Sequence, residues 1–200
     1  MAASINPIAT IQMKNGSKIV VELRPDLAPN TVNSFIYLAR KGIYDGYKIA
    51  RVEPGYVVDV TTNACNKEVA RYLIANEAEY VKESLRLRPD LGIIAMGGYG
   101  GNIAGGEFYF PLAFNQKLCN YPRFGQVLEG SEEIVRIGQG PVEAFAFQLS
   151  PNFSPHKPVH PEIIECVTVE TFGVEYPEPV RLEGVACPAH WSMEEYDSLI

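Results

Sequence analysis

The sequence predicts a mainly β domain, in which about eight antiparallel strands close into a barrel capped by two helices. Short apolar stretches alternate with turn residues over most of the 200 residues, which is typical of strands. Helices do not separate these strands regularly, which argues against a parallel α/β sheet. Periodicity alone does not distinguish a closed barrel from a sandwich of two sheets, so the sandwich stays open at this point.

The first predicted elements are a β-hairpin and a helix. Apolar and polar residues alternate over Ile8–Met13 and Ser17–Leu23, on either side of an Asn-Gly pair, which is a strong hairpin signal. The helix covers Thr31–Lys41, where apolar residues recur at helical spacing. Asn30 or Thr31 can cap its start, and Gly42 ends it.

The middle of the chain mixes strands with less regular segments. Tyr47–Val52 and Tyr56–Thr61 are predicted strands joined by a tight turn. Lys67–Leu85 is moderately helical and includes a loop. Gly92–Met96 is a short apolar strand, and the glycine-rich stretch Gly97–Gly106 is predicted to be a loop.

Three strands and a short helix follow. In the aromatic strand Glu107–Phe110 successive side chains point to opposite faces, so at least one ring belongs to the core. Phe124–Leu128 is the next strand, and Ser131–Ile137 is a helix with Ser131 as its cap. A long proline-rich loop, Gly138–Pro161, leads into the last strand, Pro161–Phe172.

Composition narrows the classes of partner. The formal net charge of -7 argues against nucleic acid, because phosphate binding needs a basic face. No stretch approaches the ~20 apolar residues of a membrane span, and the first residues lack the basic and apolar regions of a secretion signal. We therefore expect a cytoplasmic protein that binds neither nucleic acid nor membrane, while its oligomeric state stays open.

Cysteines and histidines give no sign of a metal or redox site. The four cysteines are widely spaced, with no C-x-x-C pair, and we expect free thiols at Cys65, Cys119, Cys166 and Cys187. Cys187 and His190 form a C-x-x-H pair, but two ligands do not make a tetrahedral site. His156 and His160 lie in the proline-rich loop and are expected to be solvated.

The C-terminal residues 173–200 differ in character from the rest. They hold six acidic side chains against one basic, Arg181, and so supply about -5 of the net charge. Trp191, the only tryptophan, has a large apolar surface to bury. We expect residues 1–172 to form one domain and residues 173–200 to pack on it as an acidic extension, in preference to a disordered tail.

The most informative run is Tyr44–Val60. Arg51 lies there in a mostly apolar strand, and such a charge is costly to desolvate unless it has a partner or a task. Asp59 follows across a tight turn. One hypothesis is a structural ion pair that holds two strands together, and the other is a catalytic arginine.

Six segments, in order, resemble the cyclophilins, a family of peptidyl-prolyl cis-trans isomerases. They are the opening hairpin, APNTVNSFIYLARKGIYDGYKIARV, Asn76-Glu77-Ala78, GIIAMGGYGGNIAGGEFYF, FGQVLEGSEEIVRI and PEIIECVTVE. Together they span residue 8 to about residue 172. The resemblance implies a divergent, bacterial-like cyclophilin with a closed eight-stranded antiparallel barrel capped by two helices.

The resemblance also implies roles for individual residues. Arg51 takes the position of the catalytic arginine, which donates to the prolyl nitrogen and lowers an amide barrier of ~18–20 kcal/mol without a metal or cofactor. The proline pocket is then shaped by Tyr56, Val57, Tyr109 and Leu118, the peptide is held by the backbone of Gly97 and Gly98, and Tyr121 stands where a rim histidine is expected.

Two departures from the family pattern concern charge. Asp59 and Glu107 replace glutamines, one of which orients the arginine in the family. Asp59 can fix Arg51 by pairing with it, or it can occupy the donors and cancel the positive charge that the transition state needs. We therefore predict an isomerase of reduced activity on Xaa-Pro bonds of peptides and proteins. The alternative is a non-catalytic cyclophilin-like module that binds proline-containing peptides or proteins.

Overall fold

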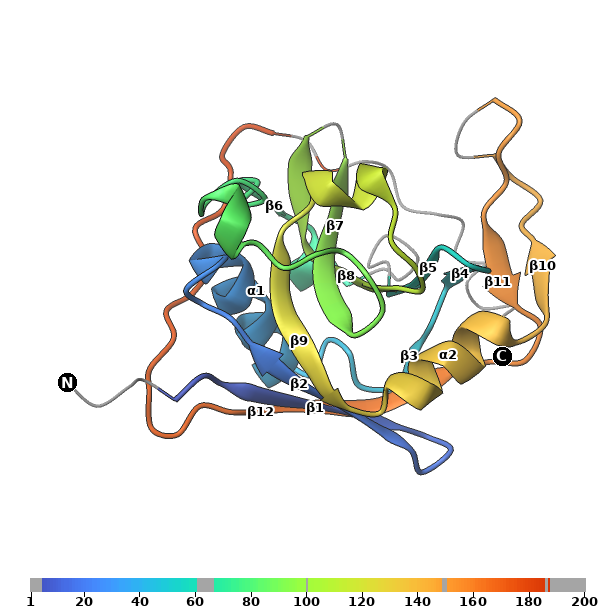
Figure 1. Ribbon diagram of the computed structural model, residues 1–200, viewed down its shortest axis with the longest axis horizontal. Coiled ribbons are helices and arrows are strands. Elements are labelled where there is room, and N and C mark those ends of the chain that lie inside the picture. The colour runs from blue at the N-terminus through green and yellow to red at the C-terminus, as the bar shows by residue number, and fades with distance from the viewer. Residues whose placement is uncertain (1–4, 61–66, 100, 149–150, 186, 188–200) are drawn as a thin grey trace.

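A computed structural model describes residues 5–60, 67–99, 101–148, 151–185 and 187 (Figure 1). A curled antiparallel sheet dominates these ranges, and two helices, α1 (Pro29–Arg40) and α2 (Ser131–Gln139), pack against it. The strands of the sheet are β1 (Ile8–Met13), β2 (Lys18–Leu23), β3 (Tyr47–Lys48), β4 (Arg51–Glu53), β5 (Val57–Val60), β6 (Leu73–Ile74), β7 (Ile93–Tyr99), β8 (Asn102–Pro111), β9 (Arg123–Glu129) and β12 (Ile163–Glu170). Short 3₁₀ turns are η2 (Glu68–Ala70), η3 (Glu83–Leu85) and η4 (Gln116–Asn120).

The mainly β prediction is confirmed, but the prediction of a closed eight-stranded barrel is wrong for the described residues. The sheet has ten strands and an open order, β3-β12-β1-β2-β9-β7-β8-β5-β4, with β6 paired to β8. The predicted strand Tyr47–Val52 breaks at Ile49 and Ala50, so that β3 pairs with β12 whereas β4 pairs with β5. Because these two residues join its ends, the sheet curls into a half-barrel.

Two further stretches differ from the prediction. Lys67–Leu85 contains no α-helix in the structure, only η2, β6 and η3. The predicted loop Gly97–Gly106 is mostly strand in its described residues, because β7 extends to Tyr99 and β8 begins at Asn102. Its glycines hide the strand pattern but permit a close approach of the backbones, since a Cβ on Gly98 would overlap the carbonyl oxygen of Asn102.

The predicted loop Gly138–Pro161 contains a second, two-stranded sheet. Strand β10 (Val142–Ala144) pairs with β11 (His156–Pro158), and this hairpin projects from the body beside β4 (Figure 1). Three-residue strands carry too little periodicity to be recognised in the sequence.

The core fills the inside of the curled sheet. Phe35 of α1, Tyr44, Phe108 of β8 and Phe124 of β9 are fully buried, with ring centroids 5.1 to 5.6 Å apart in the contacting pairs. Phe110 joins this cluster, whereas Tyr109, between the two phenylalanines, does not. The alternation along β8 thus gives one face to the core and the other to a surface pocket.

Neither helix begins with the predicted cap. Gly130, with a φ of 85°, precedes α2, and Ser131 is its first residue. Helix α1 begins at Pro29, and neither Asn30 nor Thr31 caps it. Instead the Glu77 carboxylate accepts hydrogen bonds from both backbone N–H groups, at 3.0 and 2.7 Å, and from the Thr31 hydroxyl at 2.7 Å.

Replacing Glu77 by alanine should lower the free energy of unfolding by about 1–2 kcal/mol, because the start of α1 loses its hydrogen-bond acceptor. Urea denaturation measures this change. Glu79→Ala is the matched control: Glu79 is a more exposed carboxylate two residues away, and its loss should change stability by less than about 0.5 kcal/mol. Equal effects of the two substitutions would contradict the capping role.

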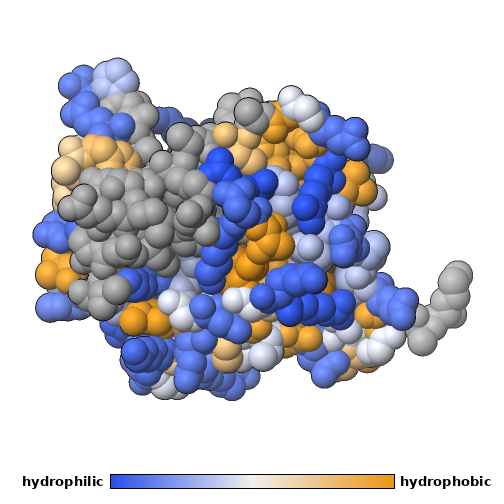
Figure 2. All heavy atoms as spheres, turned by 180° about the vertical axis from the view of Figure 1, so that it is seen from behind, coloured by the Kyte–Doolittle hydropathy of each residue, from blue (hydrophilic) through white to orange (hydrophobic). Residues whose placement is uncertain are grey.

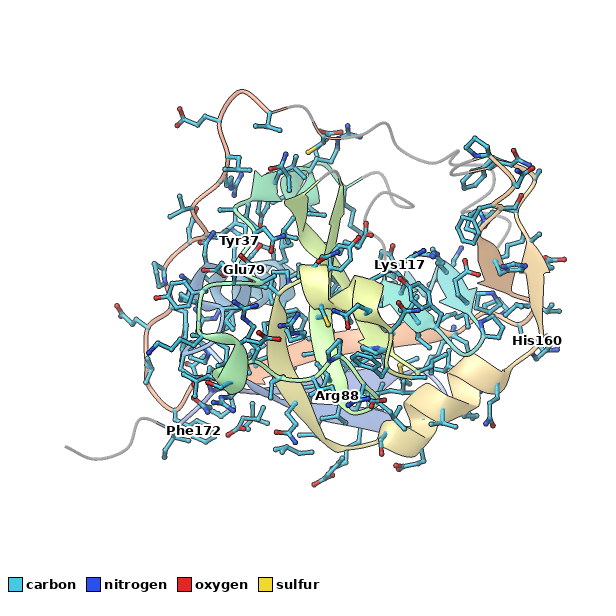
Figure 3. All side chains as sticks on the ribbon, turned by 45° about the horizontal axis from the view of Figure 1, so that its top comes forward. Tyr37, Glu79, Arg88, Lys117, His160 and Phe172 are labelled. Carbon is cyan, nitrogen blue, oxygen red and sulfur yellow. The ribbon has the colours of Figure 1, made fainter. Side chains whose placement is uncertain are left out.

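The described residues 173–185 of the C-terminal extension run back past α1, whose Tyr37 is labelled in Figure 3, toward β6. The Asn30 side chain donates to the carbonyl of Val180 at 2.9 Å and accepts from its N–H at 2.8 Å. Two residues on, the N–H of Leu182 donates to the carbonyl of Leu73 at 2.8 Å. Arg181 lies over the Tyr72 ring, 4.3 Å from its centroid. Cys65, His190 and Trp191 lie outside the described residues.

The visible surface is largely hydrophilic (Figure 2), in keeping with a composition of 20% charged residues. On the face seen in Figure 2, hydrophilic residues are widespread and hydrophobic residues reach the surface in separate groups. None of the helices in the described ranges is long and apolar enough to cross a membrane.

Candidate active site

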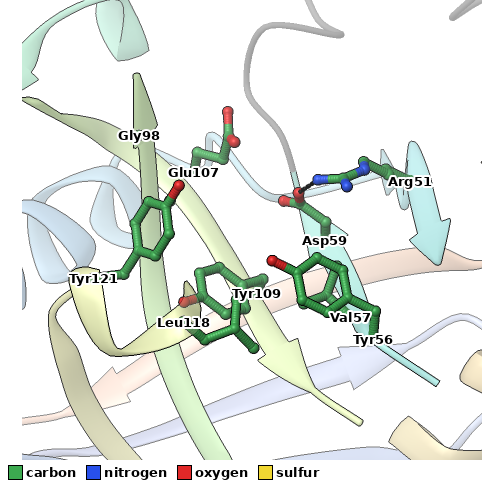
Figure 4. A pocket seen from close by; sticks show the side chains of 10 residues that line it. Arg51, Tyr56, Val57, Asp59, Gly98, Glu107, Tyr109, Leu118 and Tyr121 are labelled. Carbon is green, nitrogen blue, oxygen red and sulfur yellow. Dashed lines mark hydrogen bonds and ion pairs between the residues drawn. The ribbon is translucent and has the colours of Figure 1, made fainter. Parts of the chain in front are cut away.

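One pocket brings together all ten residues that the resemblance singled out. It holds about 350 Å³ of empty space, part of it open to solvent, and lies on the outer face of β4, β5, β7 and β8 beside η4 (Figure 4). Its lining is Arg51, Tyr56, Val57, Asp59, Gly97, Gly98, Glu107, Tyr109, Leu118 and Tyr121.

The floor of the pocket is apolar and separate from the main core. Val57, Ala95, Tyr109 and Leu118 form a buried cluster of their own, and Tyr56 and Tyr121 pack against it. The Tyr109 and Tyr121 rings meet edge to face at 5.8 Å. Such a floor has the character of a site for a small apolar ring, such as that of proline.

The pocket wall opposite Tyr121 carries the cation (Figure 4). Antiparallel pairing sets Arg51 opposite Asp59 on β5, and Asp59 in turn opposite Tyr109 on β8. Arg51 Nη1 donates to Asp59 Oδ2 at 3.0 Å. The contact is through one oxygen only, since Oδ1 of Asp59 is buried with no hydrogen-bond partner among the described residues.

Glu53 supplies a second carboxylate that contacts Arg51, and this contact was not predicted from the sequence. The Nε atom donates to Glu53 Oε1 at 3.0 Å, and Nδ1 of His156 lies 2.8 Å from Glu53 Oε2. The two-residue period of a strand puts Glu53 on the same face as Arg51, and this signal could have found it. The expectation of a solvated His156 holds only in part: its side chain is 37% exposed, but the β10–β11 hairpin, not predicted from the sequence, brings it against Glu53 of β4.

The excess of carboxylates changes the titration of the site. Burial away from water, reinforced by the negative charge of Glu107, raises the pKa of Asp59 to about 8 against the pull of Arg51. Burial opposes the charge on Arg51, but the Asp59 and Glu53 carboxylates outweigh it and raise its pKa above the usual value. Arg51 therefore stays charged while Asp59 takes up a proton near neutral pH.

Steric contacts explain why β7 has glycine at positions 97 and 98. A Cβ on Gly97 would press against the Glu107 side chain, and one on Gly98 would overlap the backbone of β8. At these two positions β7 therefore offers only backbone groups to a ligand. A side chain at Gly98 has no room in this backbone.

A family model for cyclophilin-type peptidyl-prolyl cis-trans isomerases matches residues 8–168. The chain belongs to the cyclophilin family. The predicted family and enzyme class, peptidyl-prolyl cis-trans isomerase, are confirmed, and no observation favours the non-catalytic alternative.

Relatives of this cyclophilin come from bacteria, plants and animals. It is 31% identical over 136 residues to peptidyl-prolyl cis-trans isomerase B of Bacillus subtilis, a match that covers 65% of this chain and 90% of the relative. The human peptidyl-prolyl cis-trans isomerase-like 1 is 30% identical over 126 residues, covering 60% and 73%. Isomerase CYP59 of Arabidopsis thaliana is 27% identical over 134 residues, covering 62% of this chain but only 26% of its own length.

A solved structure supports the fold. A cyclophilin of Cryptosporidium parvum, crystallised in the presence of the dipeptide Ala-Pro, superposes with a TM-score of 0.66 at 19% identity. The match covers 82% of this chain and 98% of that one.

Proposed function

We propose that this cyclophilin isomerises Xaa-Pro bonds in peptides and proteins, with Arg51 as the catalytic donor, and that it does so at a reduced rate. The observation that carries the proposal is the pocket itself, in which a half-buried guanidinium and a small apolar floor line the same cavity. The Ala-Pro dipeptide present with the C. parvum relative supports substrates that contain proline.

The chemistry needs only hydrogen-bond donors and a dry surface. Rotation about a prolyl bond requires the nitrogen lone pair to leave amide resonance. Arg51 uses Nε and Nη1 for Glu53 and Asp59, whereas Nη2 has no hydrogen-bond partner among the described residues. Nη2 is the donor we assign to the prolyl nitrogen. The half-buried setting strengthens this bond relative to one in water.

The remaining pocket residues hold the substrate. Tyr56, Val57, Tyr109 and Leu118 enclose the proline ring, the backbone at Gly97 and Gly98 binds the peptide, and Tyr121 forms the rim. We further propose that residues 1–172 are the catalytic domain, that residues 173–200 are an extension docked on it, and that the protein assists protein folding in the cytoplasm.

Replacing Leu118 by alanine should raise KM for a prolyl peptide by about fivefold or more with little change in kcat, because the proline ring loses apolar contact. Exchange spectroscopy of the cis and trans signals of an Ala-Pro peptide measures both parameters. Lys117→Ala, at the exposed neighbouring position, is the matched control and should behave as wild type. A wild-type protein that fails to accelerate the exchange would overturn the proposed function.

A further inference from the structure

The second carboxylate on Arg51 belongs to a chain of contacts that reaches outside the pocket. Glu53 uses both oxygens: Oε1 accepts from Arg51 Nε at 3.0 Å and from the backbone N–H of His156 at 3.2 Å, while Oε2 meets His156 Nδ1 at 2.8 Å. The Glu53 side chain is only 9% exposed. It is therefore a fixed bridge between the guanidinium and β11.

The hairpin that supplies His156 makes a second contact with the guanidinium. Phe153, just before β11, lies with its ring centroid 5.7 Å from Arg51 Cζ. Strand β11 packs directly against β4, although His156 lies 103 residues beyond Glu53 in the chain. The β10–β11 hairpin thus touches the catalytic arginine by a ring and holds it through a carboxylate.

The geometry explains why an arginine here needs such a support. Its long side chain has several rotatable bonds, and a single hydrogen bond at Nη1 leaves the guanidinium free to tilt. A second acceptor at Nε fixes the plane of the group, because the N–H donors of a guanidinium lie in one rigid fork. With both acceptors in place, the N–H groups of Nη2 are held in one orientation. A catalytic donor misplaced by about 1 Å can cost a hundredfold in rate.

We propose that Glu53 and His156 are positioning residues: His156 holds Glu53, and Glu53 orients the Arg51 guanidinium toward the substrate. This inference rests on the proposed catalytic role of Arg51 and adds the β10–β11 hairpin to the active site. It predicts that the hydrogen-bonding capacity of Glu53 matters more than its charge. A purely structural bridge would affect stability instead, and a purely quenching carboxylate would slow the enzyme.

Two pairs of variants separate these roles, with kcat and KM measured on a prolyl peptide by exchange spectroscopy. Glu53→Ala removes the acceptor and should lower kcat about tenfold with KM within twofold of wild type. Glu53→Gln keeps an acceptor for Nε and should retain at least a third of wild-type kcat. His156→Ala should lower kcat about fivefold, and His156→Asn, whose amide can replace Nδ1 as a donor, should restore it to within twofold.

A control variant and an Arg51→Ala background show whether the loss of kcat comes from the orientation of Arg51. Glu143→Ala removes an exposed carboxylate that pairs with Lys157 on the same hairpin and should leave kcat unchanged. In an Arg51→Ala background, assayed at high enzyme concentration, His156→Ala should cause no further loss, because there is no guanidinium left to orient.

Three results would overturn the inference. They are unchanged kcat in both alanine variants, a kcat that rises in Glu53→Ala, and an equal further loss from His156→Ala without Arg51. If any one of these is found while Arg51→Ala has lost most of its kcat, the proposed function stands and only the positioning role fails. If Arg51→Ala itself keeps wild-type kcat, both fail together. Should His156→Ala not fold, the Glu53 pair gives the same decision.

Discussion

Replacing Arg51 by alanine should lower kcat/KM for a prolyl peptide by about a hundredfold or more. Removal of one preorganised donor to a developing charge or lone pair typically costs 10²–10³ in rate, and Arg51 is the only cation among the residues that line the described pocket. Peptide affinity should change little, because the apolar floor is untouched. The expected loss therefore falls on kcat, and exchange spectroscopy at several peptide concentrations measures it.

Two controls accompany this variant. Arg51→Lys keeps the charge but not the fork of donors, and should recover only a small part of the rate. Arg88→Ala removes an arginine whose side chain is 68% exposed, outside the pocket, and should have wild-type kinetics. Activity of Arg51→Ala within a few-fold of wild type would leave the structural ion pair as the role of Arg51.

Asp59→Gln should raise kcat/KM, and the gain should grow with pH. Glutamine keeps an acceptor for Arg51 Nη1 but carries no charge to oppose the guanidinium. Because the pKa of Asp59 is raised to about 8 by burial and by Glu107, the wild-type carboxyl is mostly neutral at pH 6.5 and charged at pH 9. We expect wild-type activity to fall several-fold over this range, while Asp59→Gln stays nearly flat.

The same group links stability to pH, with a definite sign. The folded pKa of Asp59 lies above its unfolded value of about 4, so the native state binds the proton more tightly. The stabilisation is complete below about pH 4 and is lost as pH rises through about 8. Urea denaturation should show the stability of wild type falling relative to Asp59→Gln between pH 5 and 8. A parallel pH dependence of the two proteins would contradict the raised pKa.

Contacts between residues close in the chain could be predicted from the sequence, whereas contacts between distant residues could not. The pairing of Arg51 with Asp59 depends on a tight turn between adjacent strands, and the sequence shows both the turn and the two charges. The cap on α1 comes instead from Glu77, 46 residues beyond Thr31, and His156 reaches Glu53 across 103 residues. No local pattern encodes such distant contacts. They could not be predicted without the fold.

The sheet stays open between its end strands β3 and β4, and this opening could not be predicted from the sequence either. Ile49 and Ala50 are as apolar as the strand residues on either side, so the pattern predicts one unbroken strand. Whether the backbone there joins a ladder depends on the path of its neighbours, and Ile49 N–H bonds to the carbonyl of Glu162, just before β12. Closure of a barrel is thus decided by tertiary geometry.

Gly98 limits what single substitutions can change in this pocket. A substitution to asparagine would add a side chain able to hydrogen-bond to the peptide, yet its Cβ would overlap the backbone of Asn102 and Ile103. Backbone atoms cannot move aside as a flexible side chain can, so a peptide-binding side chain at this position requires prior changes in the β7–β8 hairpin. Single substitutions at Asp59 and Glu107 can change the charge of the pocket, whereas no single substitution at Gly98 can give it side-chain recognition of the peptide.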